Sequence, residues 1–189
     1  MNNEPLFLYR AFKEDEHANQ FLKGKIRFGL LDYYKNSEDD SRRDPFEGES
    51  STYSGQLHLK GGLCNPAYLL CTSGPDVDLN YLREKFGNYV VKITNPGQFR
   101  DDISNIKAFI PDVSISGNCD FKKVEYTKDQ DQPIGVEGTV RLRLYYCQKH
   151  SWFSPECEYR YVIKLKIGNI PGNFISCDVQ KKLDYLAMI

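Results

Sequence analysis

The feature that most constrains the fold is an alternating segment near the end of the chain, SPECEYRYVIKLKI, residues 154 to 167. From position 159 onward, the odd-numbered positions are all tyrosine, isoleucine or leucine, and the even-numbered positions include Arg160, Lys164 and Lys166. A period of two is typical of a β-strand with one buried face, whereas a helix would mix the two sets. The segment therefore predicts a strand, and other parts of the chain are expected to pair with it in a sheet.

Two glutamates, Glu156 and Glu158, begin this segment on the same parity as Arg160. Alternate side chains on a strand point to one face about 6–7 Å apart, so two carboxylates there can address one ligand together. A second interpretation stays open, because VRLRLYY, 140 to 146, alternates in the same way. If the two segments pair as a hairpin, a ladder of Glu–Arg pairs worth about 0.2–1 kcal/mol each explains the charges without chemistry.

The rest of the chain alternates short apolar runs with short helical patterns. Strands are predicted over 5–12, 25–31, 67–73, 88–94 and 121–127, and helices over 14–24, 79–87 and 99–109. The last residues, 174–189, are an apolar helix or strand that packs back on the body. With 189 residues and 40% hydrophobic content, we expect one α+β domain, 1–189, with a bent or split antiparallel-rich sheet and short helices.

Composition excludes several classes of protein. A net charge of -1 argues against binding polyanions through bulk positive charge. No apolar run approaches the roughly 20 residues of a membrane span, and the N-terminus lacks a signal-peptide pattern, so we expect a cytoplasmic protein without membrane contact. The six cysteines and three histidines are scattered without a C-x-x-C, which argues against a zinc site; the cysteines are expected to be buried and unpaired.

Polar residues at predicted strand ends are the candidates for a site. They occur, in chain order, as Tyr9-Arg10, Cys71-Thr72-Ser73 and Glu156-Cys157-Glu158. This order resembles the Arg, Ser-Thr-Ser, Glu-x-Glu pattern of the ADP-ribosyltransferase superfamily, whose members include bacterial toxins that cleave NAD and transfer ADP-ribose. The chain departs from that pattern at Cys71, which stands where the first serine is expected.

The resemblance implies an ADP-ribosyltransferase-like fold with NAD as substrate and no metal. Glu158 would stabilise the positive charge that develops on the ribose as nicotinamide leaves, and Glu156 would orient or deprotonate the acceptor. A guanidinium suits a diphosphate, so Arg10 would bind it. The remaining implied NAD contacts are Thr72 and Ser73 at the nicotinamide ribose or supporting Glu158, and Tyr33 or Tyr34 stacked on the nicotinamide.

Residues 36–62 are rich in Ser, Gly, Asp and Glu and are interpreted as a long loop with at most one short strand. Loops of this length inside compact domains are commonly functional. By the same resemblance, this loop would be a lid or a target-recognition element that carries Arg42, Arg43 and Glu47. A solvated surface loop is the plain alternative.

A second resemblance covers more of the chain. Tyr9-Arg10, RFGLLDYY, Asp44-Pro45-Phe46-Glu47 and the W-x-x-x-E-x-E-x-R run from Trp152 to Arg160 are similar to a poorly characterised bacterial domain family with an N-D-P-F-E box and an E-x-E-x-R strand. Arg43 stands where that box has asparagine. This resemblance implies kinship and says nothing about chemistry.

Three functional classes are open at this point. The first is an NAD-cleaving transferase acting as a toxin or antiviral-defence effector, with a protein, nucleic acid or water as acceptor and an antidote protein as a partner. The second is a metal-dependent nucleic-acid enzyme using Asp39, Asp40, Asp44 and Glu47 of the loop with His150, Glu156 and Glu158. The third is a noncatalytic binding component of a conflict between phage and host.

Overall fold

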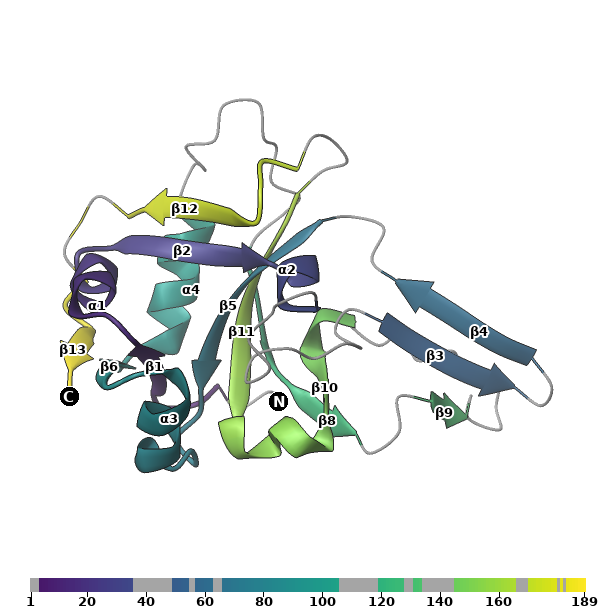
Figure 1. The fold of residues 1–189 in the computed structure, drawn as a ribbon. Helices are drawn as coiled ribbons and strands as arrows, with labels where there is room; N and C mark the ends of the chain where they lie inside the picture. Colours follow the sequence, from purple (N-terminus) through teal and green to yellow (C-terminus); the bar gives the residue numbers. More distant parts are fainter. Residues whose placement is uncertain are drawn as a thin grey trace.

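Eight strands form the central sheet of this computed structural model (Figure 1), and every pair of neighbours within it is antiparallel. The structure describes residues 4–35, 49–54, 57–62, 66–105, 119–127, 131–133, 145–165, 170–179, 181 and 183–189. The sheet strands are β1 (Leu8–Phe12), β2 (Lys25–Leu30), β5 (Ala67–Ser73), β6 (Tyr89–Ile93), β7 (Asp120–Lys123), β11 (Glu158–Lys164), β12 (Phe174–Asp178) and β13 (Leu186–Met188). The protein is an α+β single domain with a mostly antiparallel open sheet and short helices.

The sheet divides at β5, its central strand. One edge of β5 pairs with β11 along its whole length, from Ala67 to Ser73. The other edge is shared: β2 pairs with the first half of β5, at Tyr68 and Leu69, and β1 pairs with its end, at Ser73. Strands β12 and β2 continue one branch, and strands β1, β6 and β13 continue the other. The sheet therefore divides between β1 and β2, which pair with different parts of the same edge of β5.

Four short α-helices and two 3-10 helices accompany the sheet in the described part of the chain. They are α1 (Asp15–Leu22), α2 (Leu31–Lys35), α3 (Leu79–Phe86), α4 (Pro96–Asn105), η1 (Tyr145–Cys147) and η2 (Ser151–Glu156). Aromatic rings join them to the sheet: Phe99 of α4 lies 5.6 Å from Phe21 of α1 and 5.0 Å from Tyr161 of β11, between ring centroids. These rings belong to the largest buried cluster, which fixes the helices on the sheet.

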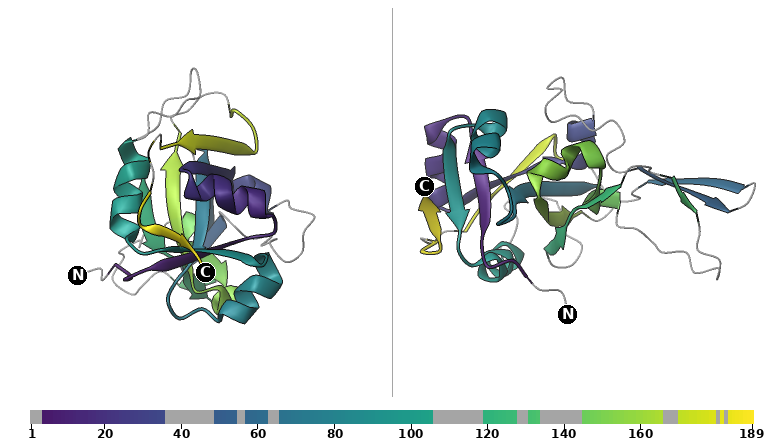
Figure 2. Two further views of the ribbon diagram at one scale, coloured as in Figure 1. Left: turned by 90° about the vertical axis from the view of Figure 1, so that its left-hand side faces the viewer. Right: turned by 90° about the horizontal axis from the view of Figure 1, so that it is seen from below.

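Two smaller sheets lie beside the central one. A hairpin of β3 (Glu49–Ser54) and β4 (Leu57–Gly62) pairs with β9 (Asp131–Pro133) and extends away from the body of the molecule (Figure 2). The other sheet is a parallel pair, β8 (Glu125–Thr127) and β10 (Gln148–His150). No helix of the described residues is long and apolar enough to cross a bilayer.

Most strands and helices lie where periodicity predicts them, and three differences have physical causes. Residues 49–54 and 57–62 form two paired strands, so the interpretation of 36–62 as a loop with at most one short strand is wrong there. The predicted strand 121–127 breaks at Val124, which is buried between β7 and β8. The predicted strand 154–167 begins only at Glu158, because residues 151–156 form η2.

Candidate functional site

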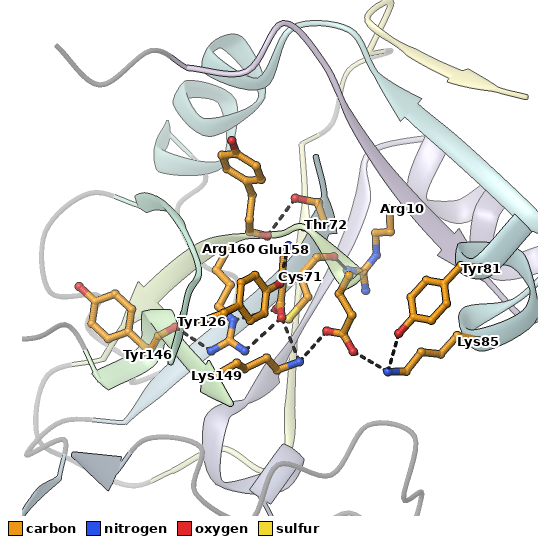
Figure 3. A network of polar contacts seen from close by, with 12 residues as sticks. Arg10, Cys71, Thr72, Tyr81, Lys85, Tyr126, Tyr146, Lys149, Glu158 and Arg160 are labelled. Carbon is orange, nitrogen blue, oxygen red and sulfur yellow. Dashed lines mark hydrogen bonds and ion pairs between the residues drawn. The ribbon is translucent and has the colours of Figure 1, made fainter. Parts of the chain in front are cut away.

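A pocket of about 120 Å³ lies where β1 and β11 flank the end of β5. Eight of the candidate residues selected from the sequence line it: Tyr9, Arg10, Tyr34, Cys71, Thr72, Ser73, Glu156 and Glu158. The close view in Figure 3 shows Arg10 and Glu158 near Cys71, whereas the Thr72 hydroxyl is directed to the Tyr159 backbone carbonyl. Segments separated by more than 140 positions in the sequence therefore meet at one place.

Strand register explains why the pocket gathers Cys71, Ser73, Glu158 and Arg160. Ser73 on β5 lies opposite Tyr9 on β1 and opposite Glu158 on β11, and Cys71 lies opposite Arg160. Directly opposed residues of antiparallel strands point to the same face of a sheet. Because side chains alternate along each strand, Cys71, Ser73, Glu158 and Arg160 share one face.

Glu158 is a buried carboxylate held by two cations. Arg160 Nε donates to Glu158 Oε1 at 2.8 Å, and Lys149 Nζ lies 3.0 Å from Glu158 Oε2. Burial alone would raise the pKa of this carboxyl, but the positive charges of Arg160 and Lys149, with hydrogen bonds from Arg160 and Cys71, lower it well below its usual range. The Glu158 amide also donates to the hydroxyl of Tyr126 at 2.8 Å. Glu158 is therefore ionised and rigidly placed.

The lowered pKa of Glu158 makes an acid-sensitive contribution to folding. A carboxyl whose folded pKa lies below its unfolded value of about 4.3 contributes stability above that pH, and loses it as pH falls through the folded pKa. We expect the free energy of unfolding of the wild type to exceed that of Glu158→Gln at pH 7, and the gap to narrow as pH falls from 5 to 3. Urea titrations of both proteins at stepped pH values check this, and a constant gap would contradict it.

Glu156 reaches the pocket by a different route from the one predicted. It ends η2 and is not on the β11 face, because Cys157 has a left-handed backbone, φ 46°, that turns the chain between the two glutamates. Glu156 Oε1 lies 2.7 Å from Lys85 Nζ, and Glu156 Oε2 lies 2.8 Å from Lys149 Nζ. Burial opposes protonation of Lys85, but the hydrogen bond and charge of Glu156 outweigh it and raise the Lys85 pKa. Lys149, not a shared strand face, brings the carboxylates together.

The alternative of a charge ladder between two hairpin strands is not observed among the described residues. Strand β11 pairs with β5 and β7, and the cations that bind Glu158 are Arg160, two positions along the same strand, and Lys149 of β10. Of the segment 140–146, residues 140–144 lie outside the described residues, and Tyr145 and Tyr146 belong to η1. Arg160 is fully buried, so β11 has no solvated polar face at this point.

Other selected residues differ in how they relate to the pocket. Arg10 Nη1 donates to the Cys71 carbonyl oxygen. Thr72 Oγ1 donates to the Tyr159 carbonyl at 3.0 Å, so its hydroxyl supports strand pairing. Tyr33 packs on Phe174 with 4.7 Å between ring centroids and does not line the pocket, unlike Tyr34. The loop residues Arg42, Arg43 and Glu47 lie outside the described residues.

The set proposed for metal binding does not come together in the described residues. His150 Nδ1 accepts from the Trp152 amide at 3.3 Å at the start of η2, and His150 does not line the pocket. Glu156 and Glu158 are bound by ammonium and guanidinium groups. Within the described ranges no three His, Cys, Asp or Glu side chains gather as a metal site; Asp39, Asp40, Asp44 and Glu47 lie outside those ranges.

Sequence reasoning missed two lysines and a tyrosine that complete the site. Lys149 comes from β10, Lys85 from α3 and Tyr126 from β8. Lys85 Nζ also donates to Tyr81 Oη at 3.1 Å, which extends the polar network onto α3. None of the three belongs to a motif of polar residues at a predicted strand end. The available signal was indirect, since two buried carboxylates require cations near them.

Comparison of the chain with protein-family models, curated proteins and solved structures finds no match. The chemistry of the pocket is therefore the basis for assigning a function.

Proposed function

We propose that the protein cleaves NAD between nicotinamide and ribose and transfers ADP-ribose to a macromolecular acceptor, with an ADP-ribosyltransferase-like fold. One observation carries the proposal: Arg10, the Cys71-Thr72-Ser73 segment and Glu158, which define the resemblance in sequence, line one pocket on three adjacent strands. If the three short segments resembled the pattern by chance, there would be no reason for them to line the same pocket. The division of the sheet at β5 is consistent with the same fold.

The size and polarity of the pocket suit one end of the dinucleotide. About 120 Å³ is below the roughly 300–1,000 Å³ of pockets that enclose a drug-sized ligand, so it takes a ring or a sugar and leaves the rest of NAD outside. Tyr34, Leu82 and Phe86 supply apolar wall, and Ser73 and Glu158 supply polar groups. This mixture fits nicotinamide or its ribose, and Arg10, which also lines the pocket, would bind the diphosphate.

Glu158 has the properties that the reaction needs. When the bond between ribose C1' and the nicotinamide nitrogen breaks, its electron pair leaves with the ring, which becomes neutral, so no general acid is required. The ribose carries the developing positive charge, and an ionised carboxylate beside it stabilises the transition state. A hydrogen bond from the ribose 2'-hydroxyl to Glu158 would strengthen as that charge builds.

A ribose hydroxyl must replace a donor that already contacts Glu158. A carboxylate accepts about four hydrogen bonds, and Arg160, Lys149 and Cys71 already contact Glu158. A thiol is the weakest of these donors. Cys71 is therefore the group that the hydroxyl displaces, and the cations keep Glu158 in place.

The cellular role that goes with this chemistry is a toxin or an antiviral-defence effector. Its acceptor is a protein or a nucleic acid, and an antidote protein is the expected partner of such an effector. Kinship with the bacterial domain family of the N-D-P-F-E box remains part of this proposal. Glu156, beside the same pocket, would orient the acceptor.

The decisive experiment follows nicotinamide release by chromatography after incubation of the protein with NAD and EDTA, with and without cell lysate. Release is expected to survive EDTA and to fall by about 10²–10³ in Glu158→Gln, which loses the charge that stabilises the transition state. Glu125→Gln is the matched control, because Glu125 is exposed on β8, and it should retain wild-type release. Wild-type release by a folded Glu158→Gln protein would remove Glu158 from the mechanism.

A further inference from the structure

Lys149 occupies the central position between the two pocket glutamates. It comes from the short strand β10, and its side chain is 8% exposed. Its Nζ lies 2.8 Å from Glu156 Oε2 and 3.0 Å from Glu158 Oε2, so one ammonium contacts both carboxylates. Figure 3 shows Lys149 within a continuous chain of polar contacts that runs from Arg160 to Lys85.

The two carboxylates could not both stay ionised in this place without cations. Their side chains are only 4% and 3% exposed. Two carboxylates that share a buried site repel each other, and such a pair retains one proton near neutral pH unless positive charge compensates. Lys85 forms an ion pair with Glu156, and Arg160 forms an ion pair with Glu158. Lys149 forms ion pairs with both carboxylates.

Other titratable and charged groups around the pair contribute to its charge state. They are Tyr9 and Arg10 on β1, Tyr34 on α2, Cys71 on β5, Tyr81 and Lys85 on α3, Tyr126 on β8, and Arg160 on β11. Arg10 adds positive charge, and burial raises the pKa of Tyr126, which stays neutral. Removing Lys149 thus leaves Lys85 paired with Glu156 and Arg160 paired with Glu158, and removes the ammonium that contacts both carboxylates.

We infer that Lys149 is a positioning residue that holds Glu156 and Glu158 side by side with both carboxylates ionised. Its consequence for catalysis rests on the proposed function, because only NAD cleavage and transfer need both charges. The effect of Lys149 on the charge state of the two glutamates does not rest on the proposed function, because it follows from the contacts of one ammonium with two buried carboxylates. The two consequences can be measured separately.

The charge state is measured by NMR titration of the carboxyl carbons in protein labelled with ¹³C-glutamate, with Glu158→Gln and Glu156→Gln used for assignment. In the wild type, Glu158 should bind no proton between pH 5 and pH 8. In Lys149→Met, the pair should take up one proton within this range, a shift of at least one pH unit. Absence of that titration in the folded variant would overturn the inference.

Two further variants serve as controls. Lys85→Met removes a cation from Glu156 and leaves Lys149 in place, so Glu158 should stay ionised above pH 5. Lys149→Arg keeps the charge and should keep both carboxylates ionised. If Lys149→Met does not fold, Lys149→Gln retains a polar side chain without the charge and is titrated in its place, with the same two outcomes.

The catalytic consequence is measured as the pH profile of nicotinamide release. Lys149→Met should release nicotinamide at least tenfold more slowly at pH 6 than at pH 8, whereas the wild-type rate should change little. An equal loss at every pH would indicate a structural role only and would overturn the positioning role. If the wild type releases no nicotinamide, the proposed function fails, and the carboxyl titration still decides the role of Lys149.

Discussion

Replacing Arg160 with methionine is expected to lower the free energy of unfolding by about 3–5 kcal/mol, because it leaves a buried carboxylate without its main partner. Arg160 is fully buried, and its guanidinium donates to both carboxylate oxygens of Glu158 and to the Tyr146 carbonyl. Methionine fills similar space but donates no hydrogen bond. Urea unfolding at pH 7, followed by far-UV circular dichroism, measures the loss.

A second ion pair in the same sheet gives the matched control. Lys164 on β11 lies 2.8 Å from Asp120, but their side chains are 31% and 39% exposed, so Lys164→Met should cost less than about 1 kcal/mol. The combined change of Arg160→Met and Glu158→Gln should cost clearly less than the sum of the single changes, because it removes both charges of the pair. Equal losses for the Arg160 and Lys164 variants would contradict the argument from burial.

Stability alone does not account for the ionic chain around the pocket. A buried ion pair loses about as much hydration energy as it gains in attraction, and hydrophobic residues of similar volume often stabilise a fold as well or better. Here five charged side chains, Lys85, Glu156, Lys149, Glu158 and Arg160, alternate in sign from α3 to β11. A site that must keep a carboxylate ionised away from bulk water requires such cations, which is consistent with the proposed role of Glu158.

The sequence predicted most of the sheet because strand periodicity is a local property. The parity of residues 158–164 correctly placed Tyr161 and Ile163 in the core and Glu158 with Arg160 on the other face. The alternating pattern did not show that the face with Glu158 and Arg160 is also buried, because burial depends on which other elements cover the strand. The hairpin of β3 and β4 was missed because Ser, Gly and Asp dominate its surroundings and are typical of loops.

The candidate site was predictable only as far as its residues follow strands. Ser73 ends β5 and Glu158 begins β11, and the pairing of β5 and β11 places them opposite each other, whereas Arg10 lies in the middle of β1. Lys85 and Lys149 come from a helix and a three-residue strand, and their approach to the glutamates is set by tertiary packing. A turn at a non-glycine residue with positive φ, as at Cys157, has no dependable signal in a single sequence.

Gly87→Ala is expected to be among the most destabilising single changes in the described part of the chain, with a loss of about 3 kcal/mol or more. Gly87 ends α3 with φ 125°, a conformation that L side chains rarely adopt. A Cβ atom there would lie 2.2 Å from the Phe12 carbonyl oxygen and 2.4 Å from the Lys13 nitrogen. Both are backbone atoms, so α3 must move away from β1. Thermal and urea unfolding measure the loss.

Gly172 separates the steric part of this effect from the conformational part. Its φ is 135°, close to that of Gly87, but a Cβ atom there would meet nothing within 4 Å. Gly172→Ala should therefore cost only the backbone strain, about 1–2 kcal/mol. Because α3 carries Leu82 and Phe86 of the pocket wall and the Lys85 that binds Glu156, Gly87→Ala should also reduce nicotinamide release, and Gly172→Ala should not. Equal stability losses in the two variants would show that contact between α3 and β1 is loose, and that the pocket wall does not depend on it.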